Sequence, residues 1–506
     1  MPSFFKTEKE NTSKTRLIDN LKIYSEKTGR NVVIYASNFL NNDSEEYYIN
    51  SFDKNGFMKV MNNLNKSKGL DLILHTPGGA ISETESNIDY LHVQFNQNIR
   101  AIIPQMAMSG GTMIACSCNE IYMGNQSSLG PVDPQILDMS AKSVIKEHEL
   151  AKKEIMEQPR AVKATIEPRI QDNKIVLDDI NITAEDFKNI NKIVITACGS
   201  AYYAGCAGKY ALEKLCRIPV SVELASELRY GEPLIDNHTL LIVLSQSGET
   251  ADTIAAMKEC KSKGAKVLAI VNVVGSTIAN LADFTIYTWA GPEIAVATTK
   301  GYTTQVAVVY LLAIYIAKLL ERIEEDTYEK CVAQVKNLPK LIQQAIDMNS
   351  SIEKMAKKNY KNSSMFFIGR NTDYAIALEA SLKMKEISYI HAESYAAGEL
   401  KHGTIALIEE KQPVVALCCN DRLFEKIISN IVEVKARGAE VLAVACVGNE
   451  KIVSVADDTC FVPAVDPVVS AAVEIVPLQL LAYYVAKEKG CDIDKPKNLA
   501  KSVTVE

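Results

Sequence analysis

Hydroxyl and amide side chains gather where an apolar run passes into an apparent helix, in LSQSGETADT at residues 244–253. Backbone N–H groups at a helix N-terminus bind phosphate, and Ser245, Ser247 and Thr250 would add neutral donors. Gln246 adds an amide, and the glycine that follows lets the backbone approach a ligand closely. We therefore predict a cradle for a phosphomonoester. The alternative is a simple helix N-cap, for which one hydroxyl would suffice.

The elements around this stretch repeat once along the chain. KSKGAKVLAIVNV (261–273) resembles KARGAEVLAVACV (435–447), and KIVITACGSAYYAG (192–205) matches SMFFIGRNTDYAIA (364–377). Continuous apolar strands that alternate with helices indicate parallel sheets covered on both faces. In such sheets ligands bind beyond the carboxyl ends of the strands, where the hydroxyl stretch stands. We predict two related α/β sandwich domains.

These patterns divide the chain into six segments. We expect a partial α/β domain over 1–139, a connector over 140–184, a first sandwich over 185–330, a helical connector over 331–357, a second sandwich over 358–495 and a tail over 496–506.

The first segment offers a different chemistry. LDLILHTPGGAIS runs from a strand into a Pro-Gly-Gly turn, and IRAIIPQMAMSGGTMIACS places Ser109 at the start of an apolar helix. A turn at Gly78 and Gly79 can present backbone N–H groups as an oxyanion hole. A serine at a strand-to-helix turn is a candidate nucleophile.

Composition sets the broad class. A chain of 506 residues exceeds one core, and 47% hydrophobic residues is ordinary for a soluble protein. The net charge of −7 argues against a general nucleic-acid binder. The start lacks the apolar core of a signal peptide, and the longest apolar run, 306–317, is too short to span a bilayer. The twelve cysteines lack metal-ligand spacing. We expect a cytoplasmic protein with reduced thiols and with no metal, nucleic acid or membrane partner.

Several stretches together resemble the isomerase half of the glutamine–fructose-6-phosphate aminotransferase (glucosamine-6-phosphate synthase) family. They are LSQSGETADT, ELASELRYGEPLI, YTWAGPEIAVATTKGYTTQ, LKMKEISYIHAESYAAGELKHGTIAL and DKPKNLAKSVTVE. That half consists of two sugar isomerase (SIS) domains, which agrees with the internal repeat. The resemblance covers about 154–506. It implies a hexose-phosphate substrate, no cofactor and a homodimer.

The resemblance also implies binding residues. The family's CGTS turn appears here as CGSA, so Ala201 lacks the last hydroxyl, which would weaken phosphate binding. Val296 and Ala500 would lie against the sugar. The phosphate would be held by Ser200, Ser245, Gln246, Ser247 and Thr250.

A catalytic set follows from the same resemblance. Lys501 would form a Schiff base with the ketose, because a neutral amine is a nucleophile and its imine an electron sink. Glu386 would move a proton between C1 and C2, with Lys383 one helical turn before it. His402 would shuttle the proton for ring opening and would enter the site from the partner subunit.

Each of these residues also has a plainer interpretation. Taken alone, Lys501 is a solvated tail charge, Glu386 an exposed helix acid and His402 a loop histidine. The motif context favours the catalytic interpretation. We interpret His391 as structural.

The segment before the SIS domains does not resemble a glutaminase domain, whose nucleophile is an N-terminal cysteine, since residue 2 is proline. LHTPGG, MAMSGGTMIA and MGNQSSLGPVDPQI instead resemble the serine-dehydrogenase-proteinase group of Clp/signal-peptide-peptidase-like serine hydrolases, with a Clp/crotonase-like α/β fold. This resemblance covers 1–137, about half of that fold, and stops before the expected lysine base. Lys142 and Lys146 are weak substitutes. We expect Gly78, Gly79 and Ser109 to be a vestigial, inactive site. The abrupt junction is also what a chimeric gene model would give.

The leading hypothesis is formation of glucosamine 6-phosphate from fructose 6-phosphate, with ammonia rather than glutamine as nitrogen donor. The alternatives are an SIS-type amino-sugar-phosphate deaminase or deglycase, a non-catalytic sugar-phosphate-binding regulator, and a serine peptidase acting through Ser109. The tail NLAKSVTVE favours the synthase over the deaminase. A regulator has no need of a base, a proton shuttle and a Schiff-base lysine together.

Overall fold

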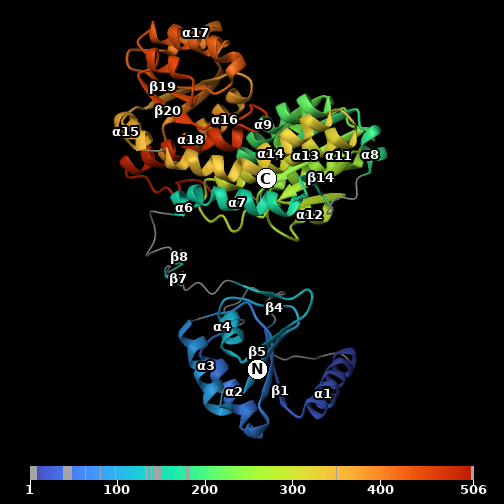
Figure 1. The fold of residues 1–506 in the computed structure, drawn as a ribbon. Coiled ribbons are helices and arrows are strands. Elements are labelled where there is room, and N and C mark those ends of the chain that lie inside the picture. Colours follow the sequence, from blue (N-terminus) through green and yellow to red (C-terminus); the bar gives the residue numbers. More distant parts are fainter. Residues whose placement is uncertain are drawn as a thin grey trace. The chain divides into compact units, whose positions relative to one another are not determined.

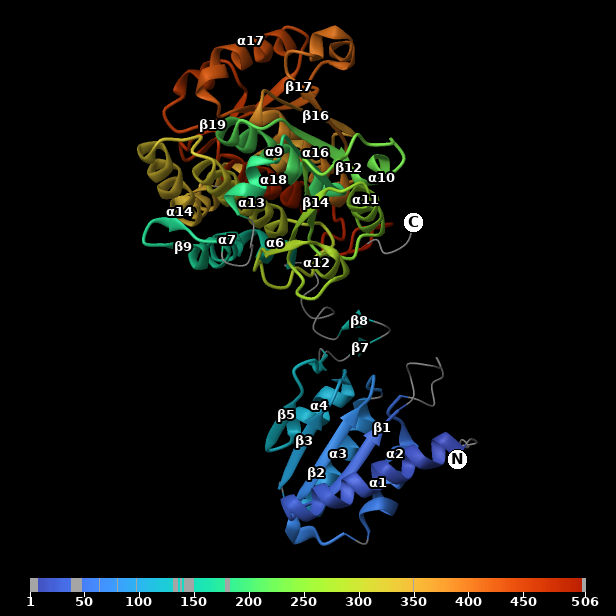
Figure 2. The same cartoon turned by 90° about the vertical axis from the view of Figure 1, so that its right-hand side faces the viewer.

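The computed structural model describes most of the chain and divides it into two compact units, 1–146 and 147–506 (Figures 1 and 2). Lys142 and Lys146 lie outside the described residues. Those residues are 8–37, 48–62, 64–79, 81–96, 98–130, 135–136, 139–140, 150–177, 183–348 and 350–502.

Unit 1 is built on a four-stranded parallel sheet in the order β1-β2-β3-β5. Its strands are β1 (Asn31–Ala36), β2 (Leu70–His75), β3 (Ile99–Ile103) and β5 (Glu120–Met123). Its helices are α1 (Glu8–Thr28), α2 (Ser51–Met61), α3 (Ile81–Phe95) and α4 (Gly110–Ser117). Short elements complete it: η2 (Lys66–Lys68), β4 (Met106–Ala107), β6 (Ser128–Leu129), β7 (Gln135–Ile136) and β8 (Met139–Ser140).

The first sandwich of unit 2 is a five-stranded parallel sheet in the order β12-β11-β13-β14-β15. Its strands are β11 (Lys192–Ala197), β12 (Val220–Leu224), β13 (Thr239–Ser245), β14 (Lys266–Val271) and β15 (Phe284–Tyr287). Its helices are α8 (Ala184–Lys188), α9 (Gly199–Cys216), α10 (Ala225–Leu228), α11 (Ala251–Ser262), α12 (Thr277–Leu281) and α13 (Lys300–Leu319).

Alternating residues of the central strand serve two cores, because successive strand side chains point to opposite faces. Leu240, Ile242 and Leu244 of β13 pack in the core that contains α9 and α13. Leu241 and Val243 pack in the core that contains α11. Every residue of β13 is buried, which explains its continuous apolar sequence.

The second sandwich repeats this strand order as β17-β16-β18-β19-β20. The helix α17 lies on the side of its sheet away from the first sandwich, and α16 and α18 share the large core with α9 and α13. The sequence prediction of two tandem parallel-sheet sandwiches is therefore confirmed. The elements are β16 (Ser364–Gly369), α16 (Thr372–Ser388), β17 (His391–Ala396), η4 (Leu400–His402), η5 (Thr404–Leu407), β18 (Pro413–Cys418), η6 (Asp421–Leu423), α17 (Phe424–Lys435), β19 (Glu440–Cys446), η7 (Glu450–Ser454), β20 (Asp458–Val462) and α18 (Ala471–Glu488).

Within the two segments expected to be connectors, the described residues 150–177, 183–184, 331–348 and 350–357 belong to unit 2. Ala151, Ile155 and Val162 enter the large core, so this part of 140–184 is packed rather than solvated. The helical connector between the sandwiches is present as two helices. The elements are α6 (Leu150–Met156), α7 (Gln158–Ile166), η3 (Glu167–Arg169), β9 (Ile170–Gln171), β10 (Lys174–Ile175), α14 (Glu325–Asp347) and α15 (Ser350–Asn359).

Among the described residues, α13 is the one helix with the length and apolar composition to cross a membrane. It is longer than the apolar run recognised in the sequence, which was judged too short. Most of it is buried inside the protein, as expected of a core helix.

Candidate functional site

A cavity of about 320 Å³ lies at the carboxyl ends of β11 and β13 in unit 2. The turn after β11, the turn after β13 and the chain tail form its wall. Of the site residues predicted in the SIS region, all but Lys383 and His402 line it, together with several that were not predicted. The lining residues are Cys198, Gly199, Ser200, Ala201, Leu244, Ser245, Gln246, Ser247, Thr250, Asp252, Val296, Thr298, Gln305, Glu386, Leu499, Ala500, Lys501 and Ser502.

The hydroxyl groups after β13 organise the turn itself. The Gly248 N–H donates to Ser245 Oγ at 2.9 Å, and the Glu249 N–H donates to Ser247 Oγ at 3.2 Å. Thr250 is the N-cap residue of α11, yet its side chain makes no capping hydrogen bond. The helix-capping interpretation therefore does not account for Thr250, and the hydroxyls surround a cavity.

Glycine is required at position 248. Its φ is +68°, and a Cβ there would lie 2.1 Å from the Ser276 hydroxyl oxygen. The turn can thus pack against α12 only with glycine.

The Lys501 amine is held by a buried carboxylate. Its Nζ lies 2.9 Å from Glu293 Oε2 and donates to the Ala295 carbonyl at 2.8 Å. The Glu293 side chain is fully buried, and the Lys501 side chain is 25% exposed. The other Glu293 oxygen accepts the N–H groups of Thr299 and Gly301. Burial acts to raise the pKa of Glu293, but Lys501 and these backbone donors outweigh it and hold the pKa below its usual value.

A second buried acid positions the loop that holds Lys501. Glu154 of α6 accepts the N–H groups of Ile294 and Ala295. Burial, together with the nearby charge of Glu293, raises the pKa of Glu154 to about 7. Asp494 accepts two N–H groups at the start of α6, and its own carbonyl accepts the Val296 N–H. Helix α6, the loop 293–297 and the tail are therefore fixed to one another.

The tail also contacts the hydroxyl turn. The Ser502 hydroxyl donates to Ser247 Oγ at 3.2 Å. A ligand phosphate at this turn would therefore meet the tail directly.

A buried charge cluster on α16 supports Glu386. The Lys383 ammonium is hydrogen-bonded to Glu386 Oε2, and it lies 3.6 Å from Glu379 Oε1. Burial acts to lower the pKa of Lys383, but the two carboxylates reverse this and raise it. Burial raises the pKa of Glu379 to about 8, against the lowering effect of Lys383. Glu386 lines the cavity. Lys383 lies one helical turn before it, as expected from the sequence.

His402 is exposed at the end of η4 and does not line this cavity. It is the one predicted catalytic side chain that stands apart from the cavity and from the residues lining it. His391 is also exposed, and it lies beside Glu393.

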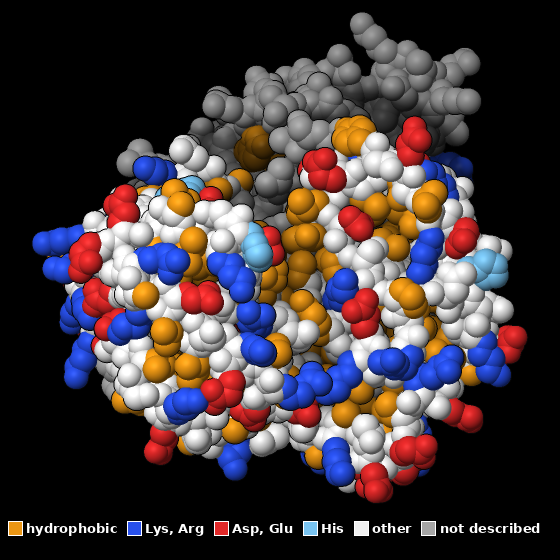
Figure 3. All heavy atoms as spheres, turned by 90° about the horizontal axis from the view of Figure 1, so that it is seen from above, with side chains coloured by type: hydrophobic (Ala, Val, Ile, Leu, Met, Phe, Trp, Pro, Cys, Tyr) orange, Lys and Arg blue, Asp and Glu red, His pale blue; other side chains and the backbone are white. Residues whose placement is uncertain are grey.

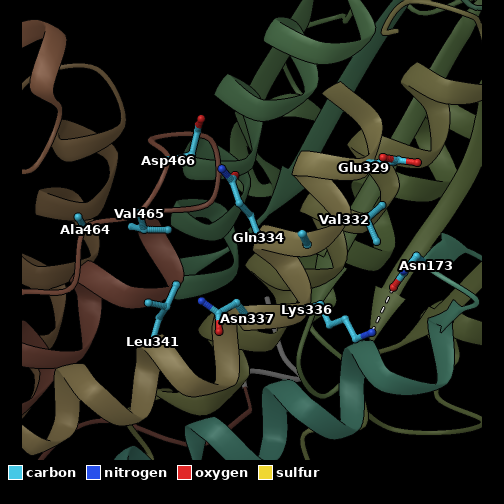
Figure 4. A pocket seen from close by; sticks show the side chains of 11 residues that line it. Asn173, Glu329, Val332, Gln334, Lys336, Asn337, Leu341, Ala464, Val465 and Asp466 are labelled. Carbon is cyan, nitrogen blue, oxygen red and sulfur yellow. Dashed lines mark hydrogen bonds between the residues drawn. The ribbon is translucent and has the colours of Figure 1, made fainter. Parts of the chain in front are cut away.

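A larger hollow of about 870 Å³ lies elsewhere in unit 2, between α14 and the loop after β20 (Figure 4). Asn173 and Lys336 are hydrogen-bonded to each other at 3.2 Å, while Glu329 and Asp466 point away from them. Its side chains do not converge on a common point, so the smaller cavity is the better candidate site.

In unit 1 the structure brings Ser109 and Gly78 together. Ser109 has φ +47°, a strained value for a residue with a side chain, and a Cβ on Gly78 would lie 2.7 Å from Ser109 Cβ. The Gly78 N–H donates to Thr76 Oγ1 at 3.1 Å, so it is engaged within the turn. A Cβ on Gly79 would collide with the Ile49 backbone.

Three buried acids of the site were not predicted from the sequence: Glu154, Glu293 and Glu379. Glu293 stands in GPEIAVATTK, which was recognised as a motif without a role for its acid. Glu379 lies four residues before Lys383 in a mostly apolar helix, and an acid at that spacing was an available signal. Glu154 gave no signal, because its partners lie 140 residues away.

Comparison with known families agrees with this architecture. The SIS domain model matches residues 186–315 and 360–488, just over half of the chain. A ClpP-like SDH-type serine proteinase model matches residues 47–195. The match to the proteinase model begins and ends later in the chain than the resemblance expected from the sequence, which covers 1–137. Residues 47–146 of the match lie in unit 1, and residues 147–195 lie in unit 2.

Individual relatives resemble the SIS part. Glutamine–fructose-6-phosphate aminotransferases [isomerizing] of Caldanaerobacter subterraneus subsp. tengcongensis and Clostridium acetobutylicum are 54% and 53% identical over 355 residues. These matches cover 70% of this chain and 58% of each relative, so the chain spans well under two thirds of their length. The C-terminal domain of glucosamine-fructose-6-phosphate aminotransferase from Francisella tularensis is 38% identical with a TM-score of 0.67, covering 71% of this chain and 100% of that one. By its two matches to the SIS domain model and its likeness to the Francisella tularensis structure, the chain belongs to the SIS-domain family.

Proposed function

We propose that unit 2 forms glucosamine 6-phosphate and water from fructose 6-phosphate and ammonia. The observation that carries this proposal is one cavity lined by a hydroxyl turn, a carboxylate and a lysine amine. The relatives at 54% and 53% identity are named for an isomerizing aminotransferase of fructose 6-phosphate, which supports the choice of substrate.

The phosphate would bind at the two turns that follow β11 and β13. Ser200, Ser245, Ser247 and Thr250 offer hydroxyl groups there, and Gln246 offers an amide. The N-terminus of α11 adds a favourable dipole for an anion. Phosphate binding would separate the Ser502 hydroxyl from Ser247 and so reposition the tail.

Lys501 would supply the covalent step. Its amine adds to the C2 carbonyl of the open-chain ketose, and water leaves to give an imine. The ammonium must first lose a proton to water, and Glu293 Oε2 holds Lys501 Nζ in place at 2.9 Å. Ammonia then displaces Lys501 from C2, which leaves the substrate as a ketimine.

Glu386 would complete the reaction. It removes a proton from C1 of the ketimine and returns a proton to C2, which gives the 2-amino aldose. Lys383 is hydrogen-bonded to Glu386 Oε2 and would hold this base in position.

His402 would act from a second copy of the chain in a homodimer. It is exposed and lies away from its own cavity, so ring opening by this residue needs another subunit. A band of apolar side chains between two more charged regions, on the face drawn in Figure 3, supports an interface.

The test is an assay of fructose 6-phosphate with either ammonium or glutamine. We expect glucosamine 6-phosphate with ammonium and no release of glutamate from glutamine, because a Clp-like segment precedes the SIS domains in this chain. Absence of glucosamine 6-phosphate with both nitrogen sources would contradict the proposed reaction. Glutamate released only when fructose 6-phosphate is present would contradict the proposed nitrogen donor.

A further inference from the structure

The residues of the two sandwiches can be aligned through the register of their paired strands. Ser245 pairs with Val271 in the first sheet, and Cys418 pairs with Ala445 in the second. The repeat KSKGAK/KARGAE makes these two strand pairs equivalent. Gln246 and Ser247 therefore correspond to Cys419 and Asn420.

The turn after β11 can be aligned in the same way with the turn after β16. Thr196 pairs with Val243, and Ile368 pairs with Ala416, so Ala201 corresponds to Asp373. The backbone supports this equivalence, because Gly199 has φ +56° and its counterpart Asn371 has φ +58°. The second domain thus keeps the strand–turn–helix geometry of the first.

The two domains differ in what stands at this position. In the first domain, Ala201 lines the open cavity together with Gln246 and Ser247. In the second, the carboxyl group of Asp373 accepts the N–H groups of Cys419 and Asn420 at 3.1 and 3.3 Å. These N–H groups correspond to those of Gln246 and Ser247, which belong to the turn that holds the phosphate in the proposed function.

We propose that the second SIS domain contains the same oxyanion site as the first and that the carboxyl group of Asp373 occupies it. Of the two SIS domains, as far as the structure describes them, the first then has the open phosphate site, although both have the same fold. This inference rests on the proposed function only for the position of the phosphate in the first domain.

The surroundings of Asp373 are those of an enclosed polar site. Asn420, the counterpart of Ser247, is 2% exposed, and among the described residues neither polar atom of its side chain has a hydrogen-bond partner. Asp373 itself is 3% exposed. Burial raises the pKa of Asp373 to about 7, while the two backbone donors act to lower it. Glu474 is also buried nearby, and burial together with the charge of Asp373 raises its pKa.

Removal of the carboxyl group should open the second site to a free anion. We expect Asp373→Ala to lower the melting temperature of the full chain by roughly 5–10 °C, because two buried N–H groups lose their acceptor. Inorganic phosphate at millimolar concentration should restore part of this loss, and should raise the melting temperature of the variant several degrees more than that of the wild type. Asp373→Asn fills the same space and is the matched control, in which phosphate should give no such gain. An equal phosphate response in wild type and Asp373→Ala would overturn the proposal.

Introducing a carboxyl group into the first domain tests the same proposal and leaves the second domain unchanged. Ala201→Asp should place a carboxylate in the first site and weaken inorganic phosphate binding at least tenfold relative to Ala201→Asn, by calorimetric titration. Equal phosphate affinity of Ala201→Asp and Ala201→Asn would overturn the proposal. This test remains valid if the Asp373→Ala variant fails to fold. Failure of the proposed reaction is a separate result, because both experiments use inorganic phosphate and no turnover.

Discussion

Replacing Lys501 separates its contribution to stability from its chemistry. Two unit charges at the observed 2.9 Å attract by about 6 kcal/mol at an effective dielectric constant of about 20, before desolvation is subtracted. Removing one partner of a buried pair typically costs about 3–5 kcal/mol. Because Lys501 is 25% exposed, we expect Lys501→Ala to lower the unfolding free energy by about 2–4 kcal/mol near neutral pH.

The pH dependence of this loss has a defined sign. The pKa of Glu293 in the folded protein lies below its usual value, so the ion pair stabilises fully above about pH 4.5 and loses its effect as pH falls through the folded pKa. In Lys501→Ala, burial would raise the pKa of Glu293 instead. The destabilisation should therefore be largest near pH 7.5 and shrink towards pH 4.5. Lys501→Arg keeps the charge and should follow the wild type.

The single tryptophan of the chain makes this measurable. Trp289 lines a hollow together with Glu293 and Lys501, so its fluorescence reports on this loop. Urea unfolding followed by that fluorescence at pH 5 and pH 7.5 compares the three proteins. If Lys501→Ala is as stable as the wild type at pH 7.5, the ion pair does not fix the tail and the argument is refuted.

Three further changes address other parts of the account. Ser247→Ala should weaken hexose-phosphate binding by about 1–3 kcal/mol, the scale for losing a hydrogen bond to a charged group, as measured by calorimetric titration. Unchanged affinity would remove Ser247 from the phosphate site. The folded pKa of Glu154, about 7, exceeds the unfolded value, so Glu154 contributes stability below pH 4.5 that is lost as pH rises through 7. Glu154→Gln should abolish this part of the pH dependence of the unfolding free energy, measured by denaturant titration. If the unfolding free energy of the variant changes with pH as in the wild type, Glu154 does not contribute in this way. Ser109 should react no faster than an ordinary serine with a fluorophosphonate, and rapid labelling that Ser109→Ala removes would show an active hydrolase.

The fold was predictable where local pattern and topology agree. The apolar strand TLLIVL and the repeated KSKGAK/KARGAE segments fix a buried parallel strand and a second copy of it. The role of 150–177 was not predictable in this way. Its helices are charged on one side, and only the tertiary structure shows that Ala151 and Val162 enter the large core.

The site was predictable in its polar turn and less so in its buried charges. Ser245, Ser247 and Thr250 lie within six consecutive residues, and the strand end that carries them fixes their position. The pair between Glu293 and Lys501 spans 208 residues, so no local periodicity could reveal it. The Schiff-base chemistry implied by the resemblance uses the neutral amine of Lys501. The structure instead places a carboxylate against it.

The central claim is that Lys501 forms an imine with fructose 6-phosphate, and borohydride trapping tests it most directly. The protein is incubated with fructose 6-phosphate, reduced with borohydride, digested and examined by mass spectrometry. We predict a hexitol 6-phosphate adduct on the tail peptide that contains Lys501, with none in Lys501→Arg, because a guanidinium stays protonated. An adduct on another lysine, or full turnover by Lys501→Arg, would contradict the account.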